Sequence, residues 1–160
     1  MAHELLGTHK ASPEWYTPFH IWDRIYGTFE TKEILDPCPI SGASGLETEW
    51  LANFIYINPP TPARLWAEKA IATFNTHPNT NILYAAFSES VLWQVPELMT
   101  YPIVFVRNRI SWDSNKSDNG KRNAPRNYNA FVLLSNDSLI LENFKNQFSE
   151  LGFLGRMVKI

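Results

Sequence analysis

An Asn-Pro-Pro-Thr tetrapeptide directly follows a short apolar run. The run is 54–57, and the tetrapeptide consists of Asn58, Pro59, Pro60 and Thr61. A β-strand must stop here, because proline has no N–H to donate to a sheet and pushes the preceding residue into extended geometry. The strand end therefore exposes the Asn58 carboxamide and backbone carbonyls as rigid hydrogen-bond acceptors. Such acceptors suit a planar amine, which an amide binds without forming an ion pair.

A carboxylate stands in the equivalent place after a second candidate strand. This strand is Glu33–Asp36, and Pro37 follows it. Ligands of open α/β sheets bind beyond the carboxyl ends of the strands, so Asp36 and Asn58 should share one crevice if the two strands are neighbours. The Asp36 carboxylate could bind a cationic or hydroxylated cofactor there. An ordinary turn is the alternative interpretation of both segments, because Asp-Pro and Asn-Pro are common turn starters.

Patterns typical of strands and helices alternate along the chain. Thr17 followed by Pro18 is typical of a helix start, with Thr17 as the N-cap and Pro18 at the first helical position. The apolar face of this helix is expected to carry Phe19, Trp22, Ile25, Tyr26 and Phe29. The other predicted helices are 62–74, 89–99 with an interruption at Pro96, and 138–151, and the predicted strands are 33–36, 54–57, 81–87, 103–106, 130–134 and 156–160. This alternation indicates an α/β sandwich around a mainly parallel sheet.

Composition indicates one ordinary globular domain. Of 160 residues, 44% are hydrophobic and 19% charged, which is typical of a single globular domain, and we expect this domain over 14–160. Residues 1–13 are mixed and polar, so we expect a flexible lead-in there. The net charge of −2 argues against strong nonspecific binding of nucleic acid. The sequence shows neither a secretion signal nor a membrane span. The single cysteine, Cys38, leaves no intramolecular disulfide and favours a reducing compartment, so we expect a cytoplasmic protein.

Two basic segments are candidates for anion binding. Arg107 and Arg109 alternate at a predicted strand end and could hold a phosphate or a carboxylate. The polar stretch 113–127 could contact DNA phosphates, although a solvated loop explains it equally well. Its basic residues are Lys116, Lys121, Arg122 and Arg126. The four histidines show no metal-ligand spacing, so we expect no metal site.

Six segments in a fixed order carry a family resemblance over roughly residues 14 to 155. They are 14–18, 34–38, Gly45-Leu46 with Trp50, 58–60, Arg109-Ile110 with Trp112, and Ala124-Pro125. The chain resembles the phage-type DNA N6-adenine methyltransferases, the Dam-like enzymes carried by phages and prophages. The resemblance implies a Rossmann-like class I methyltransferase sandwich with a mainly parallel mixed sheet. It also implies S-adenosylmethionine as cofactor, and double-stranded DNA as substrate in a bacterial host cell.

The resemblance also implies roles for individual residues. The cofactor side of the crevice would include Thr17, Pro18, Asp36 and Pro37, and the catalytic Asn-Pro-Pro-aromatic motif would correspond to Asn58, Pro59, Pro60 and Thr61. The candidate DNA contacts are Arg109, Lys121, Arg122 and Arg126. In this chemistry the adenine is flipped out of the duplex, because its amine is unreachable within the stack. The Asn58 and Pro59 carbonyls would then accept hydrogen bonds from that amine.

The chain departs from the family pattern at two positions. Thr61 replaces the aromatic residue that stacks on the flipped base, and Ser44 stands where an acidic residue precedes the Gly-Leu pair. Trp66 or Trp93 could supply the missing ring. A catalytically degenerate member that binds DNA, a nucleotide or a protein is therefore the alternative function. A methyltransferase acting on a free nucleobase or on RNA adenine is a third.

Overall fold

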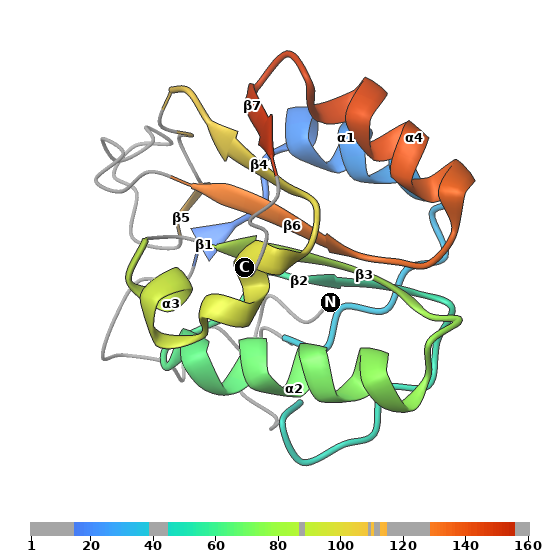
Figure 1. Ribbon diagram of the computed structural model, residues 1–160, viewed down its shortest axis with the longest axis vertical. Helices are drawn as coiled ribbons and strands as arrows, with labels where there is room; N and C mark the ends of the chain where they lie inside the picture. Colours follow the sequence, from blue (N-terminus) through green and yellow to red (C-terminus); the bar gives the residue numbers. More distant parts are fainter. Residues whose placement is uncertain are drawn as a thin grey trace.

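The chain folds into a sandwich of helices on both faces of one sheet (Figure 1). The computed structural model describes residues 15–38, 45–86, 89–108, 110, 113–114 and 129–155. The helices are α1 (Phe19–Phe29), α2 (Ala63–Thr76), α3 (Glu89–Gln94), α4 (Ser138–Phe148) and a 3-10 helix (Pro96–Thr100). The sheet strands are β2 (Phe54–Ile57), β3 (Asn81–Ala86), β4 (Ile103–Val106), β6 (Ala130–Leu134) and β7 (Gly152–Gly155). Two short strands, β1 (Trp15–Tyr16) and β5 (Asp113–Ser114), pair antiparallel outside it.

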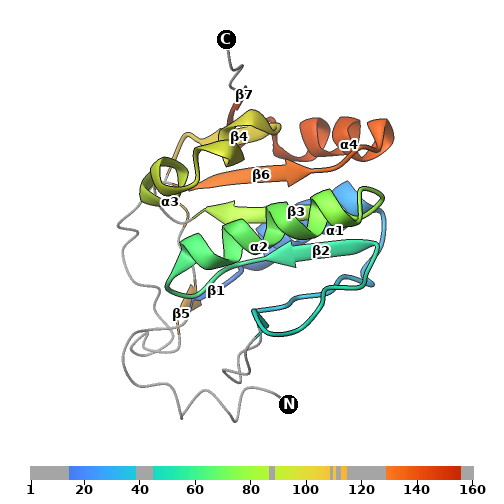
Figure 2. The ribbon, with the colours of Figure 1, turned by 60° about the horizontal axis from the view of Figure 1, so that its bottom comes forward.

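The sheet is mixed, as predicted, but it is not mainly parallel. The strand order is β2-β3-β6-β4-β7. Among the five described strands of the sheet, β2 and β3 are the one parallel pair, whereas β6 pairs antiparallel with both β3 and β4, and β7 pairs antiparallel with β4. Figure 2 shows β2 and β3 pointing one way and β6 the other. The α/β class is confirmed.

The connections explain why the sheet is mixed. Each helical crossover joins two strands that run in the same direction. Helix α2 connects β2 to β3, α3 with the 3-10 helix connects β3 to β4, and α4 connects β6 to β7. The described part of the connection from β4 to β6 contains no helix, and these two strands are antiparallel neighbours. The carboxyl ends of β2, β3 and β4 consequently lie at one edge of the sheet.

The sheet buries both of its faces. All six residues of β3 and all five of β6 are buried, as expected for central strands covered on both sides. One face packs on α2, α3 and the 3-10 helix through alternate strand residues, which include Ile55, Ile57, Ile82, Tyr84, Ile103 and Val132. The other face packs on α1 and α4 and includes Tyr56, Leu83, Val104, Phe131 and Leu133. Two continuous apolar cores therefore hold the strands in register.

The first helix differs from its prediction at its start. It begins at Phe19, Pro18 is the N-cap residue, and no side chain caps it. Phe19 is 86% exposed, whereas Ile21 is fully buried, so the apolar face is rotated from the predicted one. The predicted bounds of β4 and β6 are confirmed. A strand that was not predicted lies at Gly152–Gly155, and the predicted strand 156–160 lies outside the described residues.

No helix in the described segments has both the length and the apolar character needed to cross a lipid bilayer.

Two glycines make a matched test of this packing. A Cβ at Gly152 would lie 1.8 Å from the Phe105 carbonyl oxygen on the paired strand. Backbone cannot yield, so we expect Gly152→Ala to lower the free energy of unfolding by about 1–3 kcal/mol or more. We expect no such loss in Gly27→Ala, because only the end of the Gln147 side chain must move and alanine is favoured over glycine inside helices by up to about 1 kcal/mol. Urea unfolding of both variants measures the contrast, and equal stabilities would contradict it.

Candidate functional site

A parallel backbone bridge brings the two sequence-predicted segments together. Leu35 pairs with Ile55 at the outer edge of β2. The Leu35 N–H donates to the Phe54 carbonyl at 2.9 Å, and the Leu35 carbonyl accepts from the Tyr56 N–H at 3.0 Å. The predicted strand Glu33–Asp36 is thus reduced to a single bridge, but its direction matches that of β2. Asp36 and Asn58 both follow carboxyl ends at the same sheet edge.

Cys38 lies between Asp36 and Asn58 and bonds to both segments. The Cys38 N–H donates to Asp36 Oδ1 at 3.0 Å, and the backbone N–H of Asn58 donates to the Cys38 sulfur. Burial, reinforced by the Asp36 carboxylate, raises the pKa of the Cys38 thiol well above its ordinary value. A neutral thiol is a poor nucleophile and a poor metal ligand. Cys38 therefore connects the two segments rather than reacting.

The Asp36 carboxyl is poorly solvated for an acid. Desolvation raises the pKa of Asp36 to about 6, and the hydrogen bond from the Cys38 amide opposes this only in part. The side chain nevertheless keeps an exposed surface. Within the described part of the chain, no lysine or arginine pairs with this carboxylate. An uncompensated carboxylate that still faces solvent suits a ligand carrying hydroxyl groups or a positive charge.

Thr17 bonds to the end of β2 instead of capping α1. Its Oγ1 lies 2.9 Å from the Tyr56 hydroxyl and accepts a hydrogen bond from Asn58 Nδ2 at 3.3 Å. Tyr56 is fully buried, with Trp22 of α1 packed edge-on at 5.0 Å. Burial raises the pKa of the Tyr56 hydroxyl above its usual range, so the hydroxyl stays protonated. The predicted cofactor-side residue Thr17 is thus in direct contact with the predicted catalytic residue Asn58.

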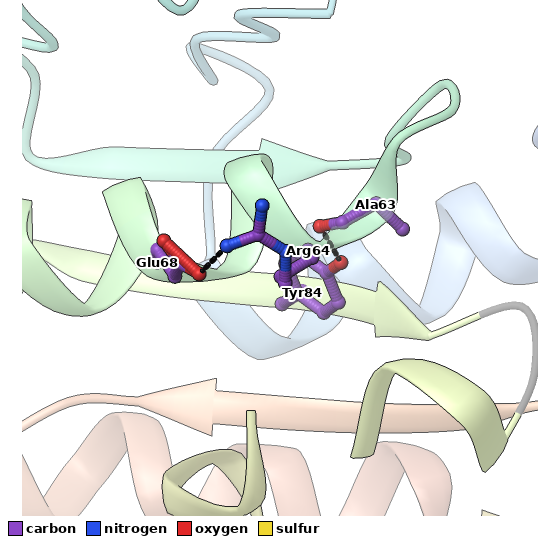
Figure 3. Close-up of polar contacts among 4 residues, drawn as sticks. All are labelled: Ala63, Arg64, Glu68 and Tyr84. Carbon is purple, nitrogen blue, oxygen red and sulfur yellow. Dashed lines mark hydrogen bonds and ion pairs between the residues drawn. The ribbon is translucent and has the colours of Figure 1, made fainter. Parts of the chain in front are cut away.

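The segment after Asn58 runs outward to α2. Pro59 is buried, whereas Pro60 and Thr61 are exposed. Figure 3 shows the Tyr84 hydroxyl donating to the Ala63 carbonyl at 2.9 Å, which fixes the first turn of α2. It also shows an ion pair between Arg64 and Glu68 on the same helix. Such an exposed pair contributes about 0.3–0.5 kcal/mol, so the buried Tyr84 bond is the more important anchor.

Trp66 and Trp93 were the predicted substitutes for the aromatic residue that is missing at Thr61, and they differ in exposure. Trp66 is only 4% exposed and stacks on Trp50 with ring centroids 6.1 Å apart, so it belongs to the core and cannot stack on a base. Trp93 is 73% exposed on α3. Phe19 is 86% exposed at the first residue of α1, two positions after Thr17. Helical periodicity predicted Phe19 on the buried face, so its exposed ring could not be identified from the sequence.

The remaining predicted residues are distributed differently. Pro18 and Pro37 are buried, and Gly45 approaches Pro37 so closely that a Cβ would lie 1.8 Å from the Pro37 carbonyl oxygen. The predicted DNA contacts Arg109, Lys121, Arg122 and Arg126 lie outside the described residues, as does Ser44. Where the structure is described, no group of three or more histidine, cysteine or acidic side chains could hold a metal ion.

A hollow of about 150 Å³ lies away from these residues. It is lined by Glu49, Trp50, Ala72, Thr73, Thr76 and His77, at the carboxyl end of α2. The Asn58 segment leads into the opposite end of that helix. The hollow is therefore separate from the carboxyl edge of the sheet, where the polar residues gather.

Neither a scan against protein-family models nor searches of curated proteins and solved structures found a match to this chain.

Asp36 gives a prediction about pH. The folded state raises its pKa from 3.8 to about 6, so between these values the folded chain binds more protons than the unfolded chain. The neutral Asp36 carboxyl makes its full contribution to the free energy of unfolding below the pKa of the unfolded chain. This contribution is lost as the pH rises through the pKa of the folded chain. We therefore expect Asp36→Asn to have the same melting temperature as the wild type at about pH 4 and a higher one at about pH 8. Thermal unfolding across this range measures the difference, and a gap that does not change with pH would contradict the assignment.

Proposed function

We propose that this protein transfers a methyl group from S-adenosylmethionine to the N6 amine of adenine in DNA. The observation that carries the proposal is the pairing of a carboxylate and a carboxamide, Asp36 and Asn58, on either side of Cys38 at one sheet edge. The Asp36 carboxylate suits the hydroxyl groups and positive charge of the cofactor. The Asn58 carboxamide and the Pro59 carbonyl suit an uncharged planar amine.

The strand directions support a Rossmann-like class I methyltransferase fold. Leu35, β2, β3 and β4 all run toward the same edge, and helical crossovers connect β2 to β3 and β3 to β4. Ligands of open α/β sheets bind at such an edge. The antiparallel β6 between β3 and β4 is compatible with this arrangement, because it changes no crossover between the other strands.

The proposed chemistry relies on positioning. The Asn58 side-chain oxygen and the Pro59 carbonyl accept hydrogen bonds from the adenine amine, which draws the nitrogen lone pair out of conjugation with the ring and orients it. Thr17, Pro18, Asp36 and Pro37 would hold the cofactor, which would supply an electrophilic methyl group on a sulfonium and leave as the neutral thioether, while the proton of the methylated amine would pass to solvent. Preorganised acceptors and orientation account for the acceleration, with no covalent enzyme intermediate.

A catalytically degenerate binding protein is the second candidate function. The exposed Thr61 and the buried Trp66 favour it, because neither offers a ring to a flipped base. Cofactor binding separates the candidates at the first step. A rise in the melting temperature with millimolar S-adenosylmethionine favours the enzyme, and no rise favours the degenerate member.

Asn58 should be essential for methyl transfer. We expect Asn58→Ala to lower the transfer rate about 10²- to 10³-fold, as does removal of one preorganised polar group from an active site. The measurement is the incorporation of tritiated methyl groups into unmethylated DNA. Asn53→Ala is the matched control, because Asn53 is an exposed asparagine at the opposite end of β2. A rate that survives in Asn58→Ala would overturn the mechanism.

Thr61 should limit the capture of the base. A base stacked on an aromatic ring gains about 1–3 kcal/mol, so we expect Thr61→Tyr to strengthen base capture or raise activity roughly 5- to 150-fold. Thr61 is exposed, so the larger ring meets no packed core. Thr61→Val keeps the size without a ring and serves as the control. A tyrosine variant no better than the valine variant would count against a flipped base at this position.

A further inference from the structure

A chain of hydrogen bonds joins Asn58 to a buried tyrosine through Thr17. Asn58 Nδ2 donates to Thr17 Oγ1 at 3.3 Å, and Thr17 Oγ1 lies 2.9 Å from the Tyr56 hydroxyl. Tyr56 and Asn58 are two residues apart at the end of β2, so their side chains leave the strand on the same face. Tyr56 packs with the residues of α1 on that face, and the turn that starts α1 carries Thr17.

The direction of these bonds decides which way the carboxamide faces. A threonine hydroxyl has one proton to donate and lone pairs that accept. Either hydroxyl can be the donor in the bond between Thr17 and Tyr56. In the bond to Asn58, Thr17 Oγ1 is the acceptor, so the amide nitrogen faces Thr17 and the amide oxygen lies on the opposite side of the planar group. Without the Tyr56 hydroxyl, the Thr17 hydroxyl would lose this partner and could rotate to donate to the amide oxygen, so the reversed orientation would become accessible.

We propose that Tyr56 and Thr17 are positioning residues that hold the Asn58 carboxamide with its oxygen toward the substrate amine. The inference rests on the proposed function, because only an amine substrate requires an acceptor at this point. A reversed carboxamide would present its own N–H groups to the N–H groups of the amine, and no hydrogen bond could form. The two residues act through Asn58 and do not touch the reacting atoms.

Kinetics test the proposal with conservative variants. We expect Tyr56→Phe to lower kcat about tenfold or more while KM for DNA and for cofactor changes less than about threefold, because orientation is lost and binding contacts are kept. Thr17→Val should lower kcat at least as much, and Thr17→Ser, which keeps the hydroxyl, should restore most of it. Tyr84→Phe is the matched control, since it also removes a buried tyrosine hydroxyl with one partner, the Ala63 carbonyl. An equal loss of kcat in Tyr84→Phe, or a change in KM alone in Tyr56→Phe, would overturn the proposal.

A second measurement does not depend on activity. The side-chain NH₂ signals of Asn58 in ¹⁵N-labelled protein report the bond to Thr17. They should shift and exchange faster with solvent in Tyr56→Phe and Thr17→Val, and stay unchanged in Tyr84→Phe. Unchanged signals in the first two variants would overturn the proposal whether or not the wild type methylates DNA. Shifted signals in a wild type that transfers no methyl group would reject the proposed function and retain the orientation by Tyr56 and Thr17.

Discussion

Two backbone hydrogen bonds at the edge of the sheet determine the arrangement of the candidate site. They join Leu35 to both sides of Ile55 and add the Leu35 segment to β2 in parallel. The contacts of Cys38 with Asp36 and Asn58 depend on this short pairing. It sets Asp36 beside the carboxyl end of β2, and it brings Cys38 within reach of the Asn58 backbone. A longer strand at Leu35 is not needed, because Pro37 and Pro59 end the Leu35 segment and β2 at the same level of the sheet.

The site concentrates features that cost stability, and the rest of the fold compensates for them. A desolvated Asp36 carboxylate and the exposed ring of Phe19 at the start of α1 are unfavourable where the protein has no ligand. The two apolar cores contain none of these features. The central strands β3 and β6 are buried along their whole length, so the cores provide stability that offsets an unfavourable arrangement at the site.

The sequence predicted the local features well and the long-range ones only in part. The bounds of β4 and β6 were predictable because short apolar runs end at turn residues, and the neighbourhood of Asp36 and Asn58 followed from two strands that each stop at a proline. The direction of β6 was not predictable, because no local pattern records how a connection without a helix returns. Thr17 was misassigned as a cap, since its contact with Tyr56 spans 39 residues and overrides its capping preference.

The antiparallel placement of β6 has a consequence for how this protein could change during evolution. Phe105 pairs with Ala130, so the stretch that contains Lys121, Arg122 and Arg126 starts and finishes on adjacent strands at the edge where Asn58 lies. Closing a loop between two ends already fixed side by side costs only about 0.6 kcal/mol for each doubling of its length. The length of the connection between these two ends can therefore change without altering the register of the sheet or the strand ends that carry Asp36 and Asn58.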